Sequence, residues 1–217
     1  MKIYLWGVQG VGKTTILRQF YSVHPNYFAM SSSELLMSIY KVSTRKELER
    51  IDIPNNIFVN HYKKYQDMIL DGDLFLAKED YDAIDIFVYI NVPNDEILKR
   101  RIADKTRIRH MDIFEIDRLV KANLVESLHI PKPVYVIDNV ESVAVALEKL
   151  EKLVAIYEDK VLTTDELRER KARELGFITT KKLIQARERG LLWVLTIVCL
   201  KCITKSYFKK DNMLQKY

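Results

Sequence analysis

Eight residues near the start of the sequence have the types and the spacing that bind phosphate. They read Gly7-Val8-Gln9-Gly10-Val11-Gly12-Lys13-Thr14. Because glycine reaches positive φ angles without strain, such a loop can turn its backbone N–H groups inward toward phosphate oxygens. A lysine near the end of the loop adds a point charge, and the hydroxyl after it can complete a Mg²⁺ shell. The segment therefore predicts a P-loop that holds the phosphates of a nucleoside triphosphate.

Four positions of the predicted P-loop have a role that follows from their chemistry. Gly7 opens the turn, and Gly12 lets the backbone approach the ligand closely. Lys13 is expected to reach the β- and γ-phosphates, and the hydroxyl of Thr14 is expected to bind Mg²⁺. The nucleotide-binding set that we predict comprises Gly7, Gly10, Val11, Gly12, Lys13, Thr14 and Thr15.

The predicted P-loop must lie between a strand and a helix, and the sequence supplies both. Residues 3–6 form an apolar run typical of a buried strand, and residues 14–21 follow as a helix whose positive dipole end points at the phosphates. Alternating strands and helices predict an α/β fold with a parallel sheet that is covered on both faces. Further strands are predicted at 27–30, 68–70, 86–90 and 134–137, and helices after Ser32 or Ser33, after Ser43 or Thr44, at 57–66, after Pro93, at 114–128 and at 143–156.

A carboxylate is needed to orient the water ligands of the Mg²⁺ ion. Asp71 directly follows the apolar strand predicted at residues 68–70, and Asp73 is a second candidate. The metal ligands that we predict are therefore Thr14 and Asp71. An alternative stays open, because Asp71-Gly72 between two apolar runs is also typical of a β-hairpin turn.

Five basic residues gather between positions 100 and 109. Arg107 and Arg109 are two residues apart, which places them on one side of an extended loop. Phosphoryl transfer depends mostly on positioning and on charge stabilisation, and a pair of guanidinium groups supplies both. A solvated basic face is the alternative interpretation. The full cluster is Arg100, Arg101, Lys105, Arg107 and Arg109.

Several of these motifs together resemble a known family. The P-loop at the start, the segment Pro93-Asn94-Asp95-Glu96-Ile97-Leu98 after an apolar strand, and Arg100 followed by Thr106-Arg107-Ile108-Arg109 resemble adenylate kinase and related nucleoside monophosphate kinases. The motifs resemble the archaeal type of adenylate kinase in particular. The resemblance covers about residues 1–157. It implies a P-loop NTPase fold with a five-stranded parallel sheet, ATP and Mg²⁺ as cofactors, and transfer of the γ-phosphate to a nucleoside monophosphate.

The resemblance also implies roles for individual residues. Lys13, Arg100, Arg107 and Arg109 would be the catalytic residues that stabilise the transferring phosphoryl group. Arg45 would bind the acceptor phosphate, because Ser43-Thr44-Arg45-Lys46-Glu47-Leu48 is similar to the monophosphate-side helix of these kinases. A general base is not required, since a phosphate acceptor is already ionised at neutral pH.

Two departures from the family pattern leave the acceptor open. Residues 72–85 are short and acidic, with Lys78 as their single basic residue, which is a poor match for an anionic monophosphate. Ala103 stands where the second lid arginine is usual, with Arg101 nearby. We therefore expect the acceptor to be a nucleoside monophosphate or a similar small molecule.

The C-terminal part of the sequence has a different character. Residues 158–217 hold 14 Lys and Arg against 8 Asp and Glu, whereas residues 1–157 hold 21 against 22. We predict a kinase-like domain over 1–157 and a basic helical extension over 158–217. The extension could bind nucleic acid or a membrane surface, and the apolar stretch at 191–204, too short to span a bilayer, could form a homodimer. A solvated face beside a docking helix is the ordinary alternative.

Three readings of the function follow from these observations. The first is a small kinase that uses ATP. The second is an ATP-dependent regulatory or nucleic-acid-associated NTPase whose extension binds its partner, and a membrane-apposed ATP-binding protein is a third reading. Cys199 and Cys202 are interpreted as two buried thiols one helical turn apart. Because two cysteines cannot build a disulfide framework and a strand occupies the first residues, we expect a cytoplasmic location.

Overall fold

A computed structural model describes most of the chain as two compact units. The units are residues 1–180 and 181–217, and each is treated by itself below. The described residues are 1–48, 50–53, 64–72, 78–104 and 112–190.

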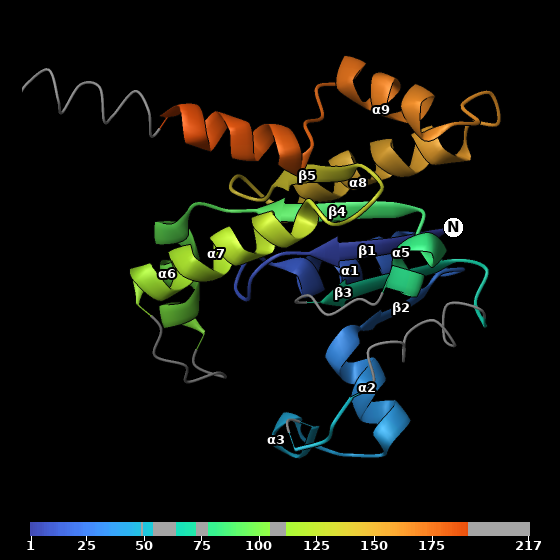
Figure 1. Cartoon of the computed structure of the whole chain (residues 1–217). Coiled ribbons are helices and arrows are strands. Elements are labelled where there is room, and N and C mark those ends of the chain that lie inside the picture. The colour runs from blue at the N-terminus through green and yellow to red at the C-terminus, as the bar shows by residue number, and fades with distance from the viewer. Residues whose placement is uncertain (49, 54–63, 73–77, 105–111, 191–217) are drawn as a thin grey trace, which may run out of the picture. The chain divides into compact units, whose positions relative to one another are not determined.

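The larger unit is built around a five-stranded sheet in the order β2-β3-β1-β4-β5 (Figure 1). All four pairings between neighbouring strands are parallel. The α/β fold predicted from the alternating pattern is therefore confirmed. The strands are β1 (Lys2–Trp6), β2 (Phe28–Ser31), β3 (Met68–Gly72), β4 (Ile86–Asn91) and β5 (Val134–Asp138).

Helices cover both faces of this sheet. In Figure 1, α5 and α7 lie on one side of the strands and α1 and α8 on the other. The described helices of the larger unit are α1 (Lys13–Val23), α2 (Ser32–Tyr40), α3 (Arg45–Leu48), α5 (Lys78–Ala83), α6 (Asn94–Ala103), α7 (Ile113–Ser127), α8 (Val143–Glu158) and α9 (Asp165–Glu174). The helix predicted at 57–66 lies mostly outside the described residues, and α5 was not expected within the acidic segment 72–85.

Aromatic side chains fix the central strands against each other on the face toward α7. The rings of Tyr4 and Phe87 meet edge to face with centroids 6.5 Å apart, and those of Trp6 and Tyr89 do so at 6.2 Å. The indole Nε1 of Trp6 also donates a hydrogen bond of 2.6 Å to Oδ1 of Asn123 on α7. Such ring pairs stabilise by about 0.5–1.5 kcal/mol beyond the area they bury. They hold the end of β1, from which the P-loop begins.

Local capping decides where α2 begins. The sequence predicts Ser32 or Ser33 as its cap, but Ser31 takes this place because it keeps an extended backbone (φ −73°, ψ 147°). Its hydroxyl accepts from the backbone N–H of Glu34, whose carboxylate accepts from the N–H of Ser31. This reciprocal pair satisfies two N–H groups that the helix itself leaves unbonded.

Gly72 at the end of β3 lies in a place that admits no side chain. A Cβ built there would be 2.6 Å from Oγ of Ser32 and closer still to the hydroxyl of Tyr4. We expect Gly72→Ala to lower the free energy of unfolding by about 1–3 kcal/mol, the usual cost of overpacking. Urea unfolding measures this loss. In a Tyr4→Phe background, which lacks the obstructing hydroxyl, the same substitution should cost less, and an equal loss in both backgrounds would contradict the steric account.

Residues 158–180, expected to belong to the extension, contact the sheet of the larger unit. The ring of Phe177 meets that of Tyr135 edge to face at 6.4 Å. The backbone N–H of Val136 donates to the carbonyl of Ile178 at 2.9 Å. The domain boundary predicted after residue 157 stays a prediction. Because these contacts would be lost in a chain that ended there, a truncation meant to keep β5 covered should retain residues up to 180.

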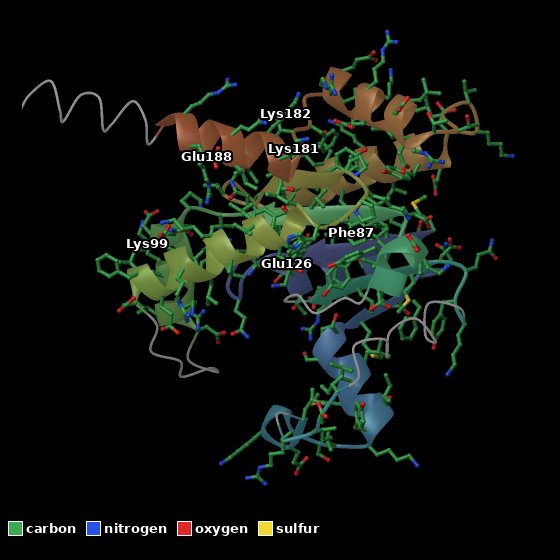
Figure 2. The ribbon with its side chains drawn as sticks, viewed as in Figure 1. Phe87, Lys99, Glu126, Lys181, Lys182 and Glu188 are labelled. Atoms are coloured by element: carbon green, nitrogen blue, oxygen red, sulfur yellow. The ribbon has the colours of Figure 1, made fainter. Side chains whose placement is uncertain are left out.

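The described part of the second unit is helical. Residues 181–190 continue a helix that begins at residue 180, and Lys181, Lys182 and Glu188 are exposed on it (Figure 2). Within the described residues, no helix is long and apolar enough to cross a membrane. The apolar stretch 191–204, including both cysteines, lies outside the described residues.

Candidate nucleotide-binding site

The predicted P-loop connects the end of β1 at Trp6 to the start of α1 at Lys13. Its three glycines all have positive φ angles, 141° at Gly7, 95° at Gly10 and 90° at Gly12. These are conformations that other residues adopt only with strain. The backbone of the segment thus has the positive φ angles that the spacing of its glycines predicts for a P-loop.

The loop lies tightly against β4 and α6. A Cβ at Gly7 would be 2.8 Å from the carbonyl oxygen of Ile90, the penultimate residue of β4. One at Gly10 would be 3.1 Å from Cγ of Arg101 and 3.4 Å from Cγ2 of Ile97, both on α6. Gly7 is therefore required by packing as well as by its backbone angle, whereas at Gly10 the side chain of Arg101 would have to shift slightly.

Lys13 is held over the loop by the loop itself. Its Nζ donates to the carbonyl oxygens of Gly7 and Val8, the latter at 3.1 Å, and the residue is 9% exposed. The first turn of α1 closes on the carbonyl of Gly12, which accepts from the N–H groups of Thr15 and Ile16 at 3.1 Å. The ammonium group and the helix N-terminus are thus brought to the same loop, as an anion site requires.

A residue that was not predicted, Asn139, bonds directly to the P-loop. It follows β5, is 2% exposed, and its Nδ2 donates to the carbonyl oxygen of Val11 at 2.7 Å. Its backbone N–H donates to the carbonyl of Asn91 at 3.0 Å. A polar residue just after a buried apolar strand was the available signal, because such residues gather at the carboxyl edge of a parallel sheet, where ligands bind.

Arg100 reaches the same place from α6. One NH2 group of its guanidinium donates to the backbone carbonyl of Asn139 at 2.8 Å, and its Nε donates to Oε1 of Glu96 at 3.0 Å. The predicted catalytic arginine thus supports the residue that touches the P-loop. Arg107 and Arg109 lie outside the described residues, and of Arg45 the structure describes only its place as the first residue of α3.

Asp71 lies on β3, the neighbour of the strand β1 from which the P-loop begins. It pairs in register with Leu5 of β1 and Ser31 of β2, and it is 4% exposed. The hairpin alternative is wrong, because β3 pairs in parallel with β1 on one edge and with β2 on the other, which leaves no edge for an antiparallel partner. Asp73 lies outside the described residues.

The residues present fit a Mg²⁺ ion that keeps most of its shell as water and phosphate oxygen. Among the described residues no group of three His, Cys, Asp or Glu could hold a metal. Magnesium at triphosphate sites is commonly bound by one or two protein groups plus phosphates, so such a group is not needed. The Thr14 hydroxyl at the start of α1 and the Asp71 carboxylate at the carboxyl end of β3 are chemically suited to this role.

Comparisons with known proteins identify the architecture. No family model and no curated protein matches the sequence. A shikimate kinase from Acinetobacter baumannii, solved in complex with shikimate, has 19% identity and a TM-score of 0.57 over 73% of this chain and 95% of its own. The chain has the fold of P-loop kinases. Two other shikimate kinases have the same fold. The one from Bacteroides thetaiotaomicron has 12% identity and a TM-score of 0.53 over 71% of this chain and 98% of its own. The one from Aquifex aeolicus has 17% identity and a TM-score of 0.51 over 71% of this chain and 97% of its own.

These similar structures are shikimate kinases rather than nucleoside monophosphate kinases. At such low identity the likeness extends to the fold alone. The resemblance to adenylate kinase in particular therefore stays a prediction, as do the roles of the individual site residues.

Proposed function

We propose that this chain is an ATP-dependent kinase that transfers the γ-phosphate to a nucleoside monophosphate or a similar small acceptor. The observation that supports it most is the P-loop, with three glycines at positive φ and the buried Lys13, set in the fold of P-loop kinases. ATP and Mg²⁺ are the proposed cofactors.

In the proposed reaction, an acceptor oxygen forms a bond to the γ-phosphorus as the bond to the β,γ-bridging oxygen breaks. The bridging oxygen leaves with the electron pair as part of ADP. Lys13 and the backbone N–H groups of the P-loop hold the outer phosphates. Thr14 and Asp71 would hold Mg²⁺, which would supply charge neutralisation. Catalysis then consists of positioning and charge stabilisation, and a phosphate acceptor needs no general base.

The arginines are proposed to stabilise charge on the transferring group, and Arg45 to bind the acceptor phosphate. Arg100 differs from the others because it already bonds to Glu96 and Asn139. To touch a phosphate it would have to leave these partners. Arg107 and Arg109 are therefore the stronger candidates for direct contact.

The acceptor is tested by coupled ADP release with MgATP as donor. The panel contains AMP, other nucleoside monophosphates, nucleosides and shikimate, which one structurally similar kinase binds. Acceleration by a monophosphate is the expected result. If MgATP binds and none of the compounds raises turnover above hydrolysis, the kinase proposal is wrong.

Arg107→Ala distinguishes phosphoryl transfer from simple binding. Because transition-state contacts act mainly on turnover, we expect kcat to fall about 100-fold or more with the dissociation constant of MgATP unchanged. Steady-state kinetics and calorimetry measure the two quantities. Lys99→Ala is the matched control, since Lys99 lies on α6 with a side chain that is 70% exposed (Figure 2). A parallel loss of ATP affinity in Arg107→Ala would contradict the proposed role.

The alternative is an NTPase that responds to nucleic acid through its C-terminal segment. The lysines exposed at 181 and 182 and the basic composition of residues 158–217 favour it. Under this alternative, RNA or DNA accelerates ATP hydrolysis by the full chain, and deletion of residues 181–217 removes the acceleration. The deletion begins at 181 because residues up to 180 pack on β5. Vesicle flotation and sedimentation of the same two proteins test the proposed membrane surface and the homodimer through residues 191–204.

A further inference from the structure

Asn139 joins three elements around the phosphate loop, and nothing in the P-loop motif itself requires it. Its side-chain amide bonds to Val11, its backbone N–H bonds to the end of β4, and its carbonyl accepts from α6. We propose that Asn139 is a positioning residue that fixes the P-loop in the conformation that receives the triphosphate. The proposal rests on triphosphate binding at the P-loop, but it does not depend on which acceptor is used.

The geometry of the peptide bond gives the physical reason. In a trans peptide the carbonyl and the following N–H point in opposite directions. By holding the carbonyl oxygen of Val11 at 2.7 Å, the amide of Asn139 turns the N–H of Gly12 to the other side of the loop. A P-loop binds phosphate through such N–H groups, so this one bond sets the direction of a ligand-binding donor.

Asn139 can set this direction because its own position is fixed. Its backbone N–H bonds to the carbonyl of Asn91 at 3.0 Å, and Arg100 donates to its carbonyl at 2.8 Å. The residue is 2% exposed, so water does not compete for its amide. Hydrogen bonds in such a site are electrostatically stronger than in water, and an unmade one is costly.

Gly12 and Asn139 are also complementary in shape. A Cβ at residue 12 would lie 2.5 Å from Nδ2 of Asn139. The amide thus occupies the space that the missing side chain leaves, directly beside the loop. Aspartate has the same shape as asparagine but would turn a carboxylate oxygen, not an N–H, toward the carbonyl of Val11. Asn139→Asp therefore removes the hydrogen bond and keeps the packing, but it also adds a negative charge beside the loop.

The test compares Asn139→Asp with Asn123→Asp in the full-length chain. Both substitutions remove a side-chain N–H that donates to a backbone carbonyl, that of Val11 or that of Leu119 at 2.9 Å. Asn123 lies on α7, where it bonds to Trp6. Calorimetry measures binding of MgATP, of MgGTP and of inorganic tripolyphosphate with Mg²⁺, which has no base or ribose.

We expect Asn139→Asp to weaken binding of all three probes by the same factor, about tenfold or more, the usual effect of leaving a buried polar group unbonded. Asn123→Asp should leave all three affinities within about twofold of the wild type, whatever it costs in thermal stability. If tripolyphosphate binds Asn139→Asp as well as wild type, the inference is overturned, and weakened ATP binding would then indicate a contact with the base. Asn139→Ala removes the amide without adding a charge and should also weaken all three probes. If Asn139→Ala binds tripolyphosphate as well as wild type does, the loss in Asn139→Asp comes from its charge and the inference is overturned.

Failure of this inference is distinguishable from failure of the proposed function. Wild-type protein that binds no probe would refute triphosphate binding and both proposals with it. Wild-type protein that binds MgATP, with Asn139→Asp binding equally well, would refute only the positioning role. A protein that binds MgATP but phosphorylates no acceptor would refute the kinase and leave this inference standing on the binding data.

Discussion

Gly12→Ala is expected to reduce the affinity for MgATP at least about 100-fold, a loss of roughly 3 kcal/mol in binding free energy. Gly12 has a φ of 90°, where a side chain alone costs about 1–2 kcal/mol. Its Cβ would also lie 2.5 Å from the amide nitrogen of Asn139, so the loop or Asn139 must move. Either movement misplaces the N–H groups that bind phosphate. Calorimetric titration with MgATP measures the loss.

Gly176→Ala is the matched control for Gly12→Ala. Gly176 has nearly the same backbone angle, φ 86°, but no atom lies within 4 Å of the Cβ that alanine would add. It should therefore lower the free energy of unfolding by about 1 kcal/mol and leave MgATP affinity unchanged. If Gly12→Ala behaved like this control, with lower stability and normal affinity, the close packing of loop and Asn139 would have no part in binding.

Lys13→Ala is expected to have an effect of similar size on triphosphate affinity. Hydrogen bonds to charged groups contribute about 1.5–3 kcal/mol, so loss of this ammonium should raise the dissociation constant on the order of 100-fold. The fold should persist, because Lys13 bonds to the carbonyls of Gly7 and Val8 within its own segment. Calorimetry measures the affinity, and thermal unfolding without nucleotide checks the fold.

Lys132→Ala is the control that shows whether removal of any hydrogen-bonded lysine lowers MgATP affinity. Lys132 also donates to two backbone carbonyls, those of Asp82 at 3.1 Å and Ile84 at 2.7 Å. It lies just before β5 and not in the P-loop. We expect it to leave MgATP affinity unchanged. MgATP binding that survives in Lys13→Ala would contradict a P-loop at residues 7–14, under the kinase and the NTPase readings alike.

Much of the fold could be predicted because its signals are local. The fully apolar runs at 86–90 and 134–137 are buried strands, as expected for a parallel sheet with both faces covered. The helix predicted at 143–156 forms as α8 for the same kind of reason, a regular apolar spacing after a capping serine. The short α5 was missed because its segment is acidic and shows little apolar periodicity.

The order of the strands could not be predicted from local pattern. Asp71-Gly72 is compatible both with a hairpin and with the end of a parallel strand, since both uses place the same residue types after an apolar run. Only the position of β3 between two parallel strands, β2 and β1, decides between them. That position also places Asp71 next to the strand that leads into the P-loop.

The sequence by itself determined the P-loop, because glycines at 7, 10 and 12 and the lysine at 13 act through backbone angles and charge within one short segment. Tertiary structure alone decided what holds that loop in place. Asn139 is 128 positions from Val11 in the chain, and it reaches Val11 because parallel strands bring their carboxyl ends to one edge of the sheet. Arg100, for which the family resemblance implied a role at the transferring phosphate, bonds to Asn139 there. A contact of this kind depends on strand order, which leaves no mark in the spacing of nearby residues.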